Sequence, residues 1–600
     1  MKQKHYLLYF FLLLAILSGC SNKDDDVLAP VISGIDDKYT TIEGTDLEIV
    51  PTITNDNSST YSWLLENKEV ANRATYTFKA SAIGSYKLIL KVTNQGGTAQ
   101  KEILITVVKR NSPPVISDIE ETYTIDAGSE IKLNPKILSD SEVTYSWFLN
   151  DEEVSKAEEY IFKVSKPGKY KLSLKVTNKE GTTVKEVSAF VNGPETKIEI
   201  SAYTILTLET PDYITNVDNI KWTVLSTSSQ LYRLSNADTK NPMFITAKEG
   251  EYRLQASDGE VKSEVKITVK KRTDKLSSYI SKVFDYMPAP GQFVNKLPEY
   301  NEGDTYQDMV KKANKWLVGE DAWMITLGGW GGYVTFGFDH TIVNIPGKRD
   351  FRINGNAFGA ATGRPGAPFG GSCEPGIIMV AYDKNKNGKP DDDEWFEIKG
   401  SSNFSAEKEP WYTIAKDNGN DTRVFRDYEM TYYKPTKEKP EITGEPDNPN
   451  AFVTIKDYIR WKDNKNNSGY KVKNVYHNQT YYPGWIKENQ LTFKGIRLPE
   501  NGVNEGKYVP GINETNTYFV LYGFRYGYVD NYPNVHENSG IDIDWAIDKN
   551  GNKVNLPGID FVKVYNGVNQ ENGWLGECST EVERGEDLHM MGVSIDTINE

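Results

Sequence analysis

"YKLILKVTN" (Tyr86–Asn94) and "YKLSLKVTN" (Tyr170–Asn178) are two copies of one motif, 84 residues apart in a chain of 600 residues. In each copy apolar and polar residues alternate, which is the pattern of a β-strand with one buried face. Two further motifs repeat with the same spacing: "PVISGI" returns as "PVISDI", and "TYSW" ends at Trp63 and again at Trp147. The first third of the chain therefore contains a tandem repeat of a β-rich unit.

Each repeat has the size and composition of a small β-sandwich. Short alternating strands are separated by turn residues, and each copy has a central tryptophan, Trp63 or Trp147, that we expect in the core. A third, divergent copy has Trp222 in this place, and "GEYRLQASDGE" from Gly250 replaces the repeated motif. The expected units are residues 29–110, 111–193 and 194–272.

Residues 273–600 form a larger module of a different kind. We expect many short antiparallel strands there, including "YFVLYGFRYGYVDN" and "IDIDWAI". One helix is expected in "DTYQDMVKKANKWLVG", with Asp304 as its N-cap and Met309, Ala313 and Trp316 on one face. The sequence predicts an all-β chain: three Ig-like sandwiches in tandem, then a larger jelly-roll-like β-sandwich with one or few helices.

Residues 1–19 have the features of a lipoprotein signal peptide. Lys2 and Lys4 precede the apolar run "YLLYFFLLLAILSGC", which is too short to span a bilayer comfortably. "LSGC" has the form of a bacterial lipobox, so we expect a lipid on Cys20; ordinary cleavage with a free Cys20 is the alternative. Residues 20–28 would be an acidic tether, whose "SNKDDD" resembles the surface-export signal of Bacteroidetes lipoproteins. We expect attachment to the outer membrane, facing outward.

Charge and cysteine content narrow the possible partners. The formal net charge is −15, without a long basic block, so we expect no nucleic-acid partner. Apart from Cys20 the chain has only Cys373 and Cys578. An oxidising compartment permits a disulfide between them, and two buried thiols are the alternative. We expect no redox cofactor.

The stretch "YDKNKNGKPDDDEWFEI" (residues 382–398) has the spacing of a calcium-binding loop. The expected ligands are Asp383, Asn385, Asn387, the Lys389 carbonyl, Asp391 and Glu394. Strands rather than helices flank the loop, so the calcium would be structural and would not drive a conformational switch. The alternative is an acidic hairpin without metal. "DKNGNK" from Asp548 starts similarly but lacks the later acids, so it is predicted to be a plain turn.

Two aromatic-rich stretches are candidates for ligand binding. Trp330 and Tyr333 lie in "GGWGGY", and Tyr526 and Tyr528 lie in "YFVLYGFRYGYVDN". Exposed aromatic rings could form a platform for a sugar ring or a flat macrocycle. The alternative for all four residues is the sandwich core.

Catalysis has weak support in the sequence. Neither H-E-x-x-H nor G-x-S-x-G occurs, and the histidines show no metal-ligand spacing. Carboxylates remain: Glu374, Asp542 and Asp544. On one strand face, Asp542 and Asp544 would be about 7 Å apart, suitable for an inverting glycosidase, a second metal site or loop capping.

The repeats resemble the PKD-like, immunoglobulin-like domain family. "GGSCEPGIIMVAYDKNKNGKPDDDEWFEIKGS" and "GWLGECSTEV" resemble a family of Bacteroidetes surface lipoproteins over nearly the whole mature chain. This resemblance implies sandwich repeats followed by a β-sandwich at the cell surface. It also suggests a TonB-dependent transporter as partner, including corrinoid uptake systems, and supplies no catalytic residue.

We therefore expect a non-catalytic surface lipoprotein that captures a ligand for TonB-dependent uptake, with a corrinoid as the first expectation. The alternatives are a glycan-binding lipoprotein, an adhesin or scaffold that binds another protein, and a glycoside hydrolase. The sequence does not rank the ligands.

Overall fold

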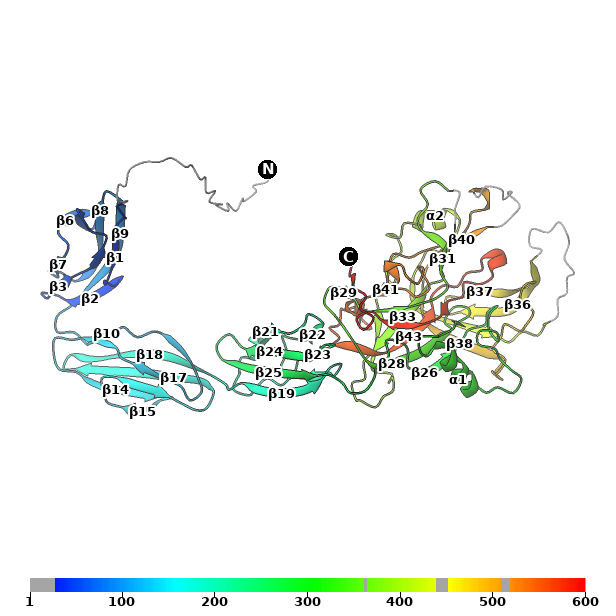
Figure 1. The fold of residues 1–600 in the computed structure, drawn as a ribbon, viewed down its shortest axis with the longest axis horizontal. Coiled ribbons are helices and arrows are strands. Elements are labelled where there is room, and N and C mark those ends of the chain that lie inside the picture. The colour runs from blue at the N-terminus through cyan, green and yellow to red at the C-terminus, as the bar shows by residue number, and fades with distance from the viewer. Residues whose placement is uncertain (1–26, 361–363, 439–451, 509–517, 599–600) are drawn as a thin grey trace, which may run out of the picture. The chain divides into compact units, whose positions relative to one another are not determined.

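The computed structural model describes residues 27–360, 364–438, 452–508 and 518–598 (Figure 1). The predicted signal peptide, Cys20 and "SNKDDD" lie outside the described residues. Within the described ranges, none of the helices has the length and apolar character needed to cross a membrane. The chain divides into two compact units, residues 1–192 and 193–600, which are described separately.

The first two repeats are β-sandwiches with the same strand order. In the first, the larger sheet runs β2(Lys38–Ile42)-β9(Gly97–Val108)-β8(Gly84–Asn94)-β5(Thr60–Leu65)-β6(Lys68–Ala71), and the facing pairs are β1(Val31–Ser33)-β4(Thr52–Thr54) and β3(Asp46–Ile49)-β7(Tyr76–Lys79). In the second, the larger sheet runs β11(Thr122–Asp126)-β18(Gly181–Asn192)-β17(Gly168–Asn178)-β14(Thr144–Leu149)-β15(Glu152–Ser155), and the facing pairs are β10(Val115–Ser117)-β13(Lys136–Leu138) and β12(Glu130–Leu133)-β16(Tyr160–Lys163). In both, the first strand of the larger sheet runs parallel to its neighbour.

The repeated motifs take the places that their alternation predicts. Trp63 and Trp147 are fully buried, each with its indole N–H bonded to a backbone carbonyl, that of Arg73 (2.9 Å) or Ala157 (3.1 Å). A buried indole N–H needs such a partner, which explains why the environment of each tryptophan recurs in the other repeat. The prediction of core tryptophans is confirmed.

The third repeat is a sandwich of a four-stranded and a three-stranded sheet, in place of the five-stranded sheet and two facing pairs of the first two repeats. Its sheets are β19(Thr196–Ser201)-β25(Lys262–Lys270)-β24(Gly250–Ser257)-β21(Lys221–Thr227) and β20(Leu206–Thr207)-β23(Met243–Thr246)-β22(Tyr232–Ser235). Trp222 is buried, and β19 pairs in parallel with β25. The divergent copy is thus a third Ig-like sandwich.

The last module is built on one large antiparallel sheet. It runs β26(Lys282–Met287)-β28(Tyr333–Val343)-β43(Gly558–Asn566)-β33(Gly376–Ala381)-β34(Trp395–Ile398)-β42(Ala546–Ile547). Smaller sheets are β37(Ser468–Asn474)-β36(Val453–Asp463)-β35(Phe425–Tyr433)-β38(Gln490–Arg497), β31(Phe358–Gly359)-β32(Gly370–Ser372)-β40(Phe519–Tyr522)-β39(Gly502–Asn504) and β41(Gly540–Ile541)-β30(Phe351–Ile353)-β45(Gly585–Asp587). Two pairs, β27(Ile325–Thr326)-β44(Glu581–Val582) and β29(Lys348–Arg349)-β46(Ile595–Asp596), complete the module. The predicted all-β fold, with open antiparallel sheets in this module, is confirmed.

The predicted helix is present with a different cap. Helix α1 spans Tyr306–Leu317, and Thr305 is the N-cap: its hydroxyl accepts from Asp308 N, and the Asp308 side chain accepts from Thr305 N. Asp304, the residue expected as the cap, instead pairs with Lys312. A second helix, α2 (Tyr412–Asp417), and 3-10 turns at Val217–Asn219, Gly506–Tyr508, Glu537–Ser539, Ile543–Trp545 and Gly573–Leu575 complete the helical elements of the described residues.

Two stretches expected as continuous strands are interrupted. In "YFVLYGFRYGYVDN" only Phe519–Tyr522 is a strand. Farther along the same stretch, Gly527 and Asp530 have positive φ angles of 87° and 55°, which an extended chain does not have. In "IDIDWAI" the turn Ile543–Trp545 separates β41 from β42. The prediction that each of these segments is a continuous strand, with alternate side chains on opposite faces, is therefore wrong.

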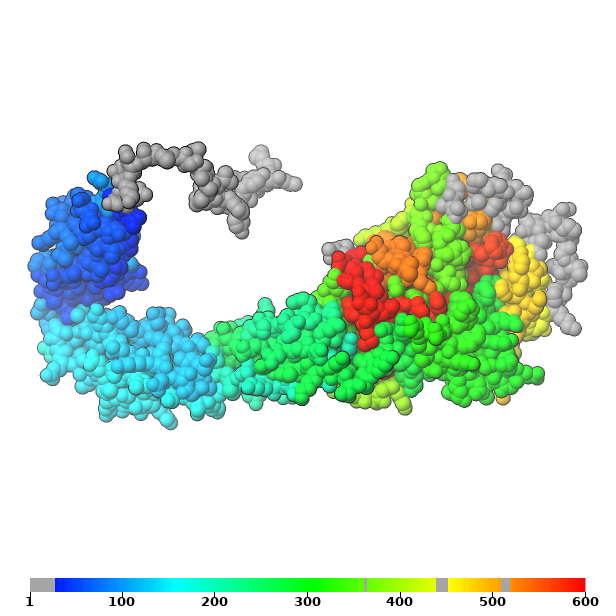
Figure 2. All heavy atoms as spheres, in the orientation of Figure 1, coloured from blue at the N-terminus to red at the C-terminus, as the bar shows by residue number. Residues whose placement is uncertain are grey.

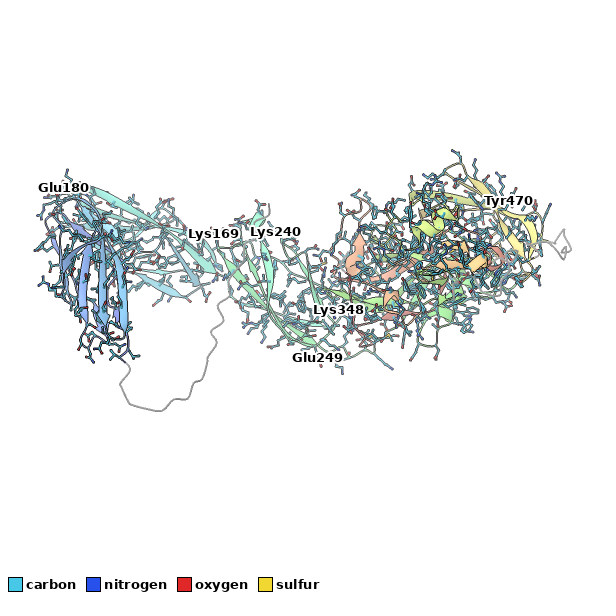
Figure 3. The ribbon with its side chains drawn as sticks, turned by 90° about the horizontal axis from the view of Figure 1, so that it is seen from above. Lys169, Glu180, Lys240, Glu249, Lys348 and Tyr470 are labelled. Carbon is cyan, nitrogen blue, oxygen red and sulfur yellow. The ribbon has the colours of Figure 1, made fainter. Side chains whose placement is uncertain are left out.

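The third sandwich packs against the last module within the 193–600 unit (Figures 1 and 2). Ile245 and Ala247 of the sandwich form one apolar cluster with Val343 and Ile345 of the module. Lys348 lies near this contact, and Tyr470 on β37 lies at the other end of the module (Figure 3). The contact leaves the far end of the module clear of the third sandwich.

Candidate functional site

The 383–394 loop, which connects β33 to β34, turns around its first aspartate. The two carboxylate oxygens of Asp383 accept the backbone N–H groups of Asn387 (3.0 Å) and Gly388 (2.7 Å). Gly388 has a φ of 71°, a left-handed conformation that glycine adopts without steric cost. The tight turn that the sequence predicts at this position is present.

The remaining polar side chains of the loop converge on its interior. The side-chain amides of Asn385 and Asn387 both donate to Asp391 Oδ2, at 2.6 and 2.7 Å. Glu394, only 1% exposed, accepts the backbone N–H of Asp391 at 3.2 Å. Two amides bonded to one carboxylate oxygen show that these three side chains reach the same point.

This donor set fits calcium. Calcium binds six to eight oxygens, and rotating the two asparagine amides by half a turn would point oxygens instead of NH₂ groups toward the centre. Three side chains converge, Glu394 accepts backbone N–H groups of the loop, and Asp383 borders the turn. Lys389, the expected carbonyl ligand, donates its N–H to Asn387 Oδ1 (2.8 Å). Calcium itself stays a prediction.

The loop at Asp548 serves as an internal comparison. Asp548 accepts the backbone N–H groups of Asn550 and Asn552, both at 2.8 Å, and Gly551 has a φ of 83°. It is the plain turn that the sequence predicts, with the same opening as the 383–394 loop and no later acids.

Three of the four predicted platform aromatics are core residues, which corrects the prediction for Trp330, Tyr526 and Tyr528. Their exposed fractions are 0%, 5% and 2%. The glycines around Trp330 allow close packing rather than exposure: a Cβ on Gly332 would lie 1.9 Å from the Leu327 carbonyl oxygen. The Trp330 indole N–H donates to the Ile496 carbonyl oxygen at 3.0 Å.

The fourth aromatic, Tyr333, lies at a cavity of about 630 Å³ on one face of the large sheet. Strand register places side chains there: Lys563, Met379, Glu397 and Ile547 face one another in a row across β43, β33, β34 and β42. Since side chains two residues apart share a face, Trp395 joins them from β34. Strand β38 supplies another wall, from Thr492 to Ile496.

The cavity borders the 383–394 loop. Asp392 of that loop lines the cavity, and Trp395 follows Glu394 directly in the chain. Trp395 is half-buried, and among the described residues no aromatic ring or cation is stacked on it. Any ion that fixes Glu394 would therefore fix the backbone that carries an open indole ring.

Charged groups of the cavity are held in defined positions. Arg426 Nη2 lies 2.6 Å from Glu397 Oε2, and Arg426 Nη1 also donates to the Asn403 carbonyl (3.1 Å). Lys563 Nζ lies 4.1 Å from the centre of the Tyr333 ring, and burial lowers the pKa of Lys563. Within the described ranges, Lys563 forms no hydrogen bond or ion pair, but the carboxylates of Asp285 and Asp392 lie close enough to raise its pKa against the effect of burial. The cavity thus contains a fixed ion pair and an ammonium whose hydrogen-bond donors are free of acceptors from the residues that the structure describes.

Asp542 and Asp544 cap and bridge neighbouring segments, which matches loop capping, one of the three roles that the sequence left open for them. Asp542 caps the 543–545 turn, accepting the Asp544 N–H at 2.7 Å, and also binds the Thr597 hydroxyl. Asp544 is engaged by Arg233. Both acids therefore have structural partners. Glu374 lies elsewhere, beside Asp530 and Glu581.

The structure has two free cysteines rather than a disulfide. Cys373 and Cys578 are both fully buried, and burial raises the pKa of each thiol well above its ordinary value. Thiols in such apolar surroundings are protonated and unreactive. This outcome corresponds to the alternative of two buried thiols.

The sequence-based reasoning missed Trp395, Lys563, Arg426 and Glu397. Two signals were present in the sequence. Lys563 interrupts the apolar strand "DFVKVYNG", and Trp395 and Glu397, two residues apart in "EWFEI", lie on the same face of a strand. A charged residue in the middle of an apolar strand often marks a face that is not simply core. Arg426 could not be found in this way, because its place depends on the pairing between distant segments.

Comparison with known proteins identifies the repeats. Residues 30–94 and 113–178 match the PKD-like domain family. No curated protein matches the chain in sequence.

Among solved structures, the titin I-band fragment I67–I69 is 13% identical, with 41% of this chain and 99% of that chain covered and a TM-score of 0.18. The insect immune protein hemolin is 12% identical, with 40% and 76% covered and a TM-score of 0.19. Likenesses this distant say nothing about function. The first two repeats are Ig-like PKD domains in tandem, which indicates an adhesion or scaffold role.

Proposed function

We propose that this chain is a non-catalytic, lipid-anchored surface protein whose last module binds a carbohydrate in the cavity between β34, β38 and β43. The observation that carries the proposal is that a half-buried Trp395 ring and the Lys563 ammonium, which has no hydrogen-bond acceptor among the described residues, line one cavity on the same sheet face. A sugar ring offers an apolar face for the indole, and its hydroxyl or carboxylate oxygens can accept from the ammonium.

The fixed ion pair adds specificity to this binding. Glu397 accepts hydrogen bonds from ligand hydroxyls, and Arg426 donates them, in a geometry already set by their mutual contact. Groups held in place before binding lose little conformational entropy when the ligand arrives. A cavity of about 630 Å³ is within the usual range for small-ligand sites, roughly 300–1,000 Å³.

The same features favour binding over cleavage. Glycoside hydrolysis needs one carboxylic acid and one carboxylate on either side of the scissile bond. The buried carboxylate of the cavity, Glu397, is engaged by Arg426 and by the amide of Asn403. Of the other acids there, Asp392 is exposed and Asp548 is half-buried, and both lie in loops. Ig-like and PKD-like domains are themselves typically non-catalytic, which agrees with this assignment.

Anchoring and transport extend the proposal beyond the last module. The "LSGC" motif supplies a lipid on Cys20, and the acidic residues after it direct the protein to the outer face of the outer membrane. The resemblance to Bacteroidetes surface lipoproteins suggests that a TonB-dependent transporter receives the ligand. It also suggests a corrinoid as the alternative ligand.

A binding screen tests the proposal. The mature chain without its lipid-bearing Cys20, residues 21–600, in about 1 mM calcium, is applied to an array of polysaccharides and, by calorimetry, to cobalamin. We expect retention on a subset of glycans without release of shorter sugars. Heat with cobalamin alone would replace the carbohydrate by a corrinoid, and sugar release would indicate a hydrolase. Binding to neither would leave the adhesin or scaffold role.

A further inference from the structure

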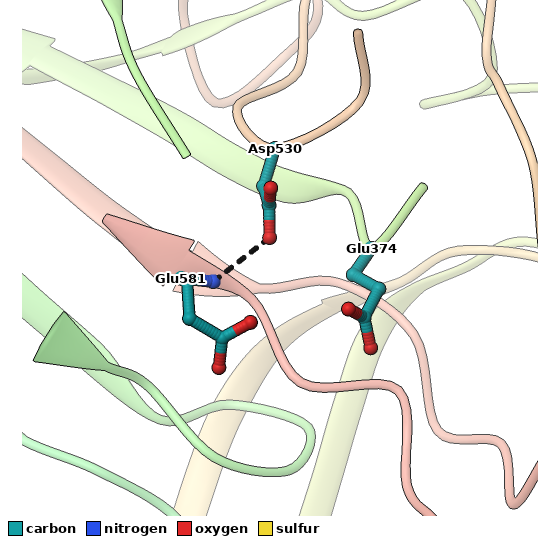
Figure 4. A group of neighbouring side chains, drawn as sticks. All are labelled: Glu374, Asp530 and Glu581. Carbon is teal, nitrogen blue, oxygen red and sulfur yellow. Dashed lines mark hydrogen bonds between the residues drawn. The ribbon is translucent and has the colours of Figure 1, made fainter. Parts of the chain in front are cut away.

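Three acidic side chains meet in the interior of the last module, away from the cavity. Glu374 precedes β33, Asp530 follows the segment after β40, and Glu581 begins β44. One carboxylate oxygen of each lies within 4.8 Å of the others (Figure 4). Asp530 and Glu581 are 3% and 1% exposed, and Glu374 is partly buried. Three distant segments thus bring acids to one buried point.

Neighbouring donors hold two of these carboxylates in place. Asp530 accepts three backbone N–H groups, from Asn356 and Ala357 at 2.8 Å and from Glu581 at 2.9 Å. Glu374 accepts the N–H of Ser579 at 2.8 Å. Three N–H donors on one carboxylate favour its ionised form.

Glu581 is only half satisfied. Its Oε1 accepts the hydroxyls of Thr326 (2.9 Å) and Ser579 (2.8 Å). Its Oε2 is buried and has no hydrogen-bond partner. A buried polar atom without a partner costs about 1–3 kcal/mol, and more if it is charged. Figure 4 shows the Glu581 carboxylate near those of Asp530 and Glu374, so the carboxylate with the unpartnered oxygen belongs to the cluster.

The cluster lacks a protein counter-charge. Among the described residues, no lysine, arginine or histidine forms an ion pair with Glu374, Asp530 or Glu581. Burial raises the pKa of all three carboxyl groups above their ordinary values. Three buried carboxylates need neutralisation by protons or by a cation.

We propose that Glu374, Asp530 and Glu581 bind a calcium ion inside the last module. Two oxygens that bind one calcium ion lie at most about 4.6–5.2 Å apart, twice the usual Ca–O distance, and the three oxygens of this cluster lie within 4.8 Å of one another. A purely oxygen donor set favours a hard cation, and calcium accepts irregular arrangements more readily than magnesium. The ion fills the vacant coordination of Glu581 Oε2 and ties three segments together.

The experiment isolates this site from the 383–394 loop. The mature chain carrying Asp383→Asn and Asp391→Asn, with an inactive loop, is dialysed against about 1 mM calcium, and bound metal is counted by mass spectrometry of the digested protein. We expect one calcium per chain. Adding Glu581→Gln or, separately, Glu374→Gln should weaken binding at least about tenfold, because affinity follows ligand charge. Asp542→Asn, at another buried acid, should leave the ion bound.

Several outcomes would overturn the proposal. A folded loop variant without calcium would mean that the cluster is neutralised by protons. Calcium retained equally in the Glu581→Gln and Glu374→Gln chains would place the ion elsewhere. Magnesium bound in preference to calcium would refute the choice of ion. If one glutamine variant does not fold, the other variant and the metal count of the loop variant still decide the question. None of these results depends on carbohydrate binding.

Discussion

Arg233 of the third sandwich and Asp544 of the last module form a bidentate ion pair across 311 residues of sequence, with Nη2–Oδ1 and Nη1–Oδ2 distances of 2.6 and 3.1 Å. Asn344 also donates to Asp544 Oδ1 at 3.1 Å. The side chains are only 10% and 17% exposed. This pair, beside the apolar cluster of Ile245 and Val343, explains why residues 193–600 form one unit.

We predict that Asp544→Asn lowers the free energy of unfolding of the 193–600 unit by about 2–4 kcal/mol, because Arg233 stays buried without its anionic partner. Denaturant unfolding of the mature chain measures the change. The control is Asp596→Asn, which breaks an exposed pair with Lys348 and should cost less than about 1 kcal/mol. Equal effects of the two changes would show that the buried pair does not join the two parts.

Calcium should order the 383–394 loop. Hydrogen exchange of its backbone amides should slow when calcium is added, because the ion fixes both ends of the loop. The effect should disappear in the Asp383→Asn, Asp391→Asn chain and persist in Asp548→Asn, the matched change in the plain turn. At a calcium concentration 100 times the dissociation constant, binding contributes about 2.7 kcal/mol. If calcium does not change the hydrogen-exchange rates of the loop amides in the unaltered chain, the loop is an ordinary acidic hairpin.

Trp330 should behave as a core residue. Trp330→Ala removes a fully buried ring and leaves a cavity, so we expect a loss of about 3–5 kcal/mol in the free energy of unfolding. Trp323 is 62% exposed, and Trp323→Ala should change stability by no more than about 0.5 kcal/mol. Tryptophan fluorescence during denaturant unfolding compares the variants. A Trp330→Ala chain as stable as the unaltered one would contradict the core assignment.

The anchoring proposal makes a prediction in cells. Protease added outside should remove the protein from intact cells, because the lipid on Cys20 holds it on the outer face. Cys20→Ala should abolish lipid attachment and release the protein from the outer-membrane fraction. Immunoblots of fractions from protease-treated cells give the result. Full protection in cells with an intact outer membrane would refute surface exposure.

Much of the fold could be predicted because its signals are local. Alternation within nine residues determines which face of "YKLILKVTN" is buried, and the Trp63 repeat marks the centre of each sandwich. The signal for the helix was also local. The choice between Asp304 and Thr305 as its N-cap depends on the reciprocal hydrogen bonds between Thr305 and Asp308. The loop at Asp383 was found for the same reason, since its ligands lie within twelve residues.

The cavity could not be predicted, because pairing between distant segments creates it. Lys563 and Glu397 share a row only because β33 lies between their strands, and no short motif encodes that register. The aromatic prediction failed for a related reason. Glycines beside Trp330 suggest an exposed loop, yet their role is to let backbones approach one another. Buried Glu581 and Asp530 are likewise 51 residues apart and became neighbours only in the fold.

The most direct test of the account is the affinity of the mature chain for its best glycan, measured by calorimetry with single cavity variants. Trp395→Ala and Lys563→Met should each weaken binding at least about tenfold, equivalent to 1.4 kcal/mol, while the melting temperature stays close to that of the unaltered chain. Trp323→Ala, at an exposed tryptophan outside the cavity, should bind as the unaltered chain does. Undiminished affinity in folded Trp395→Ala and Lys563→Met chains would contradict the claim that this cavity is the binding site.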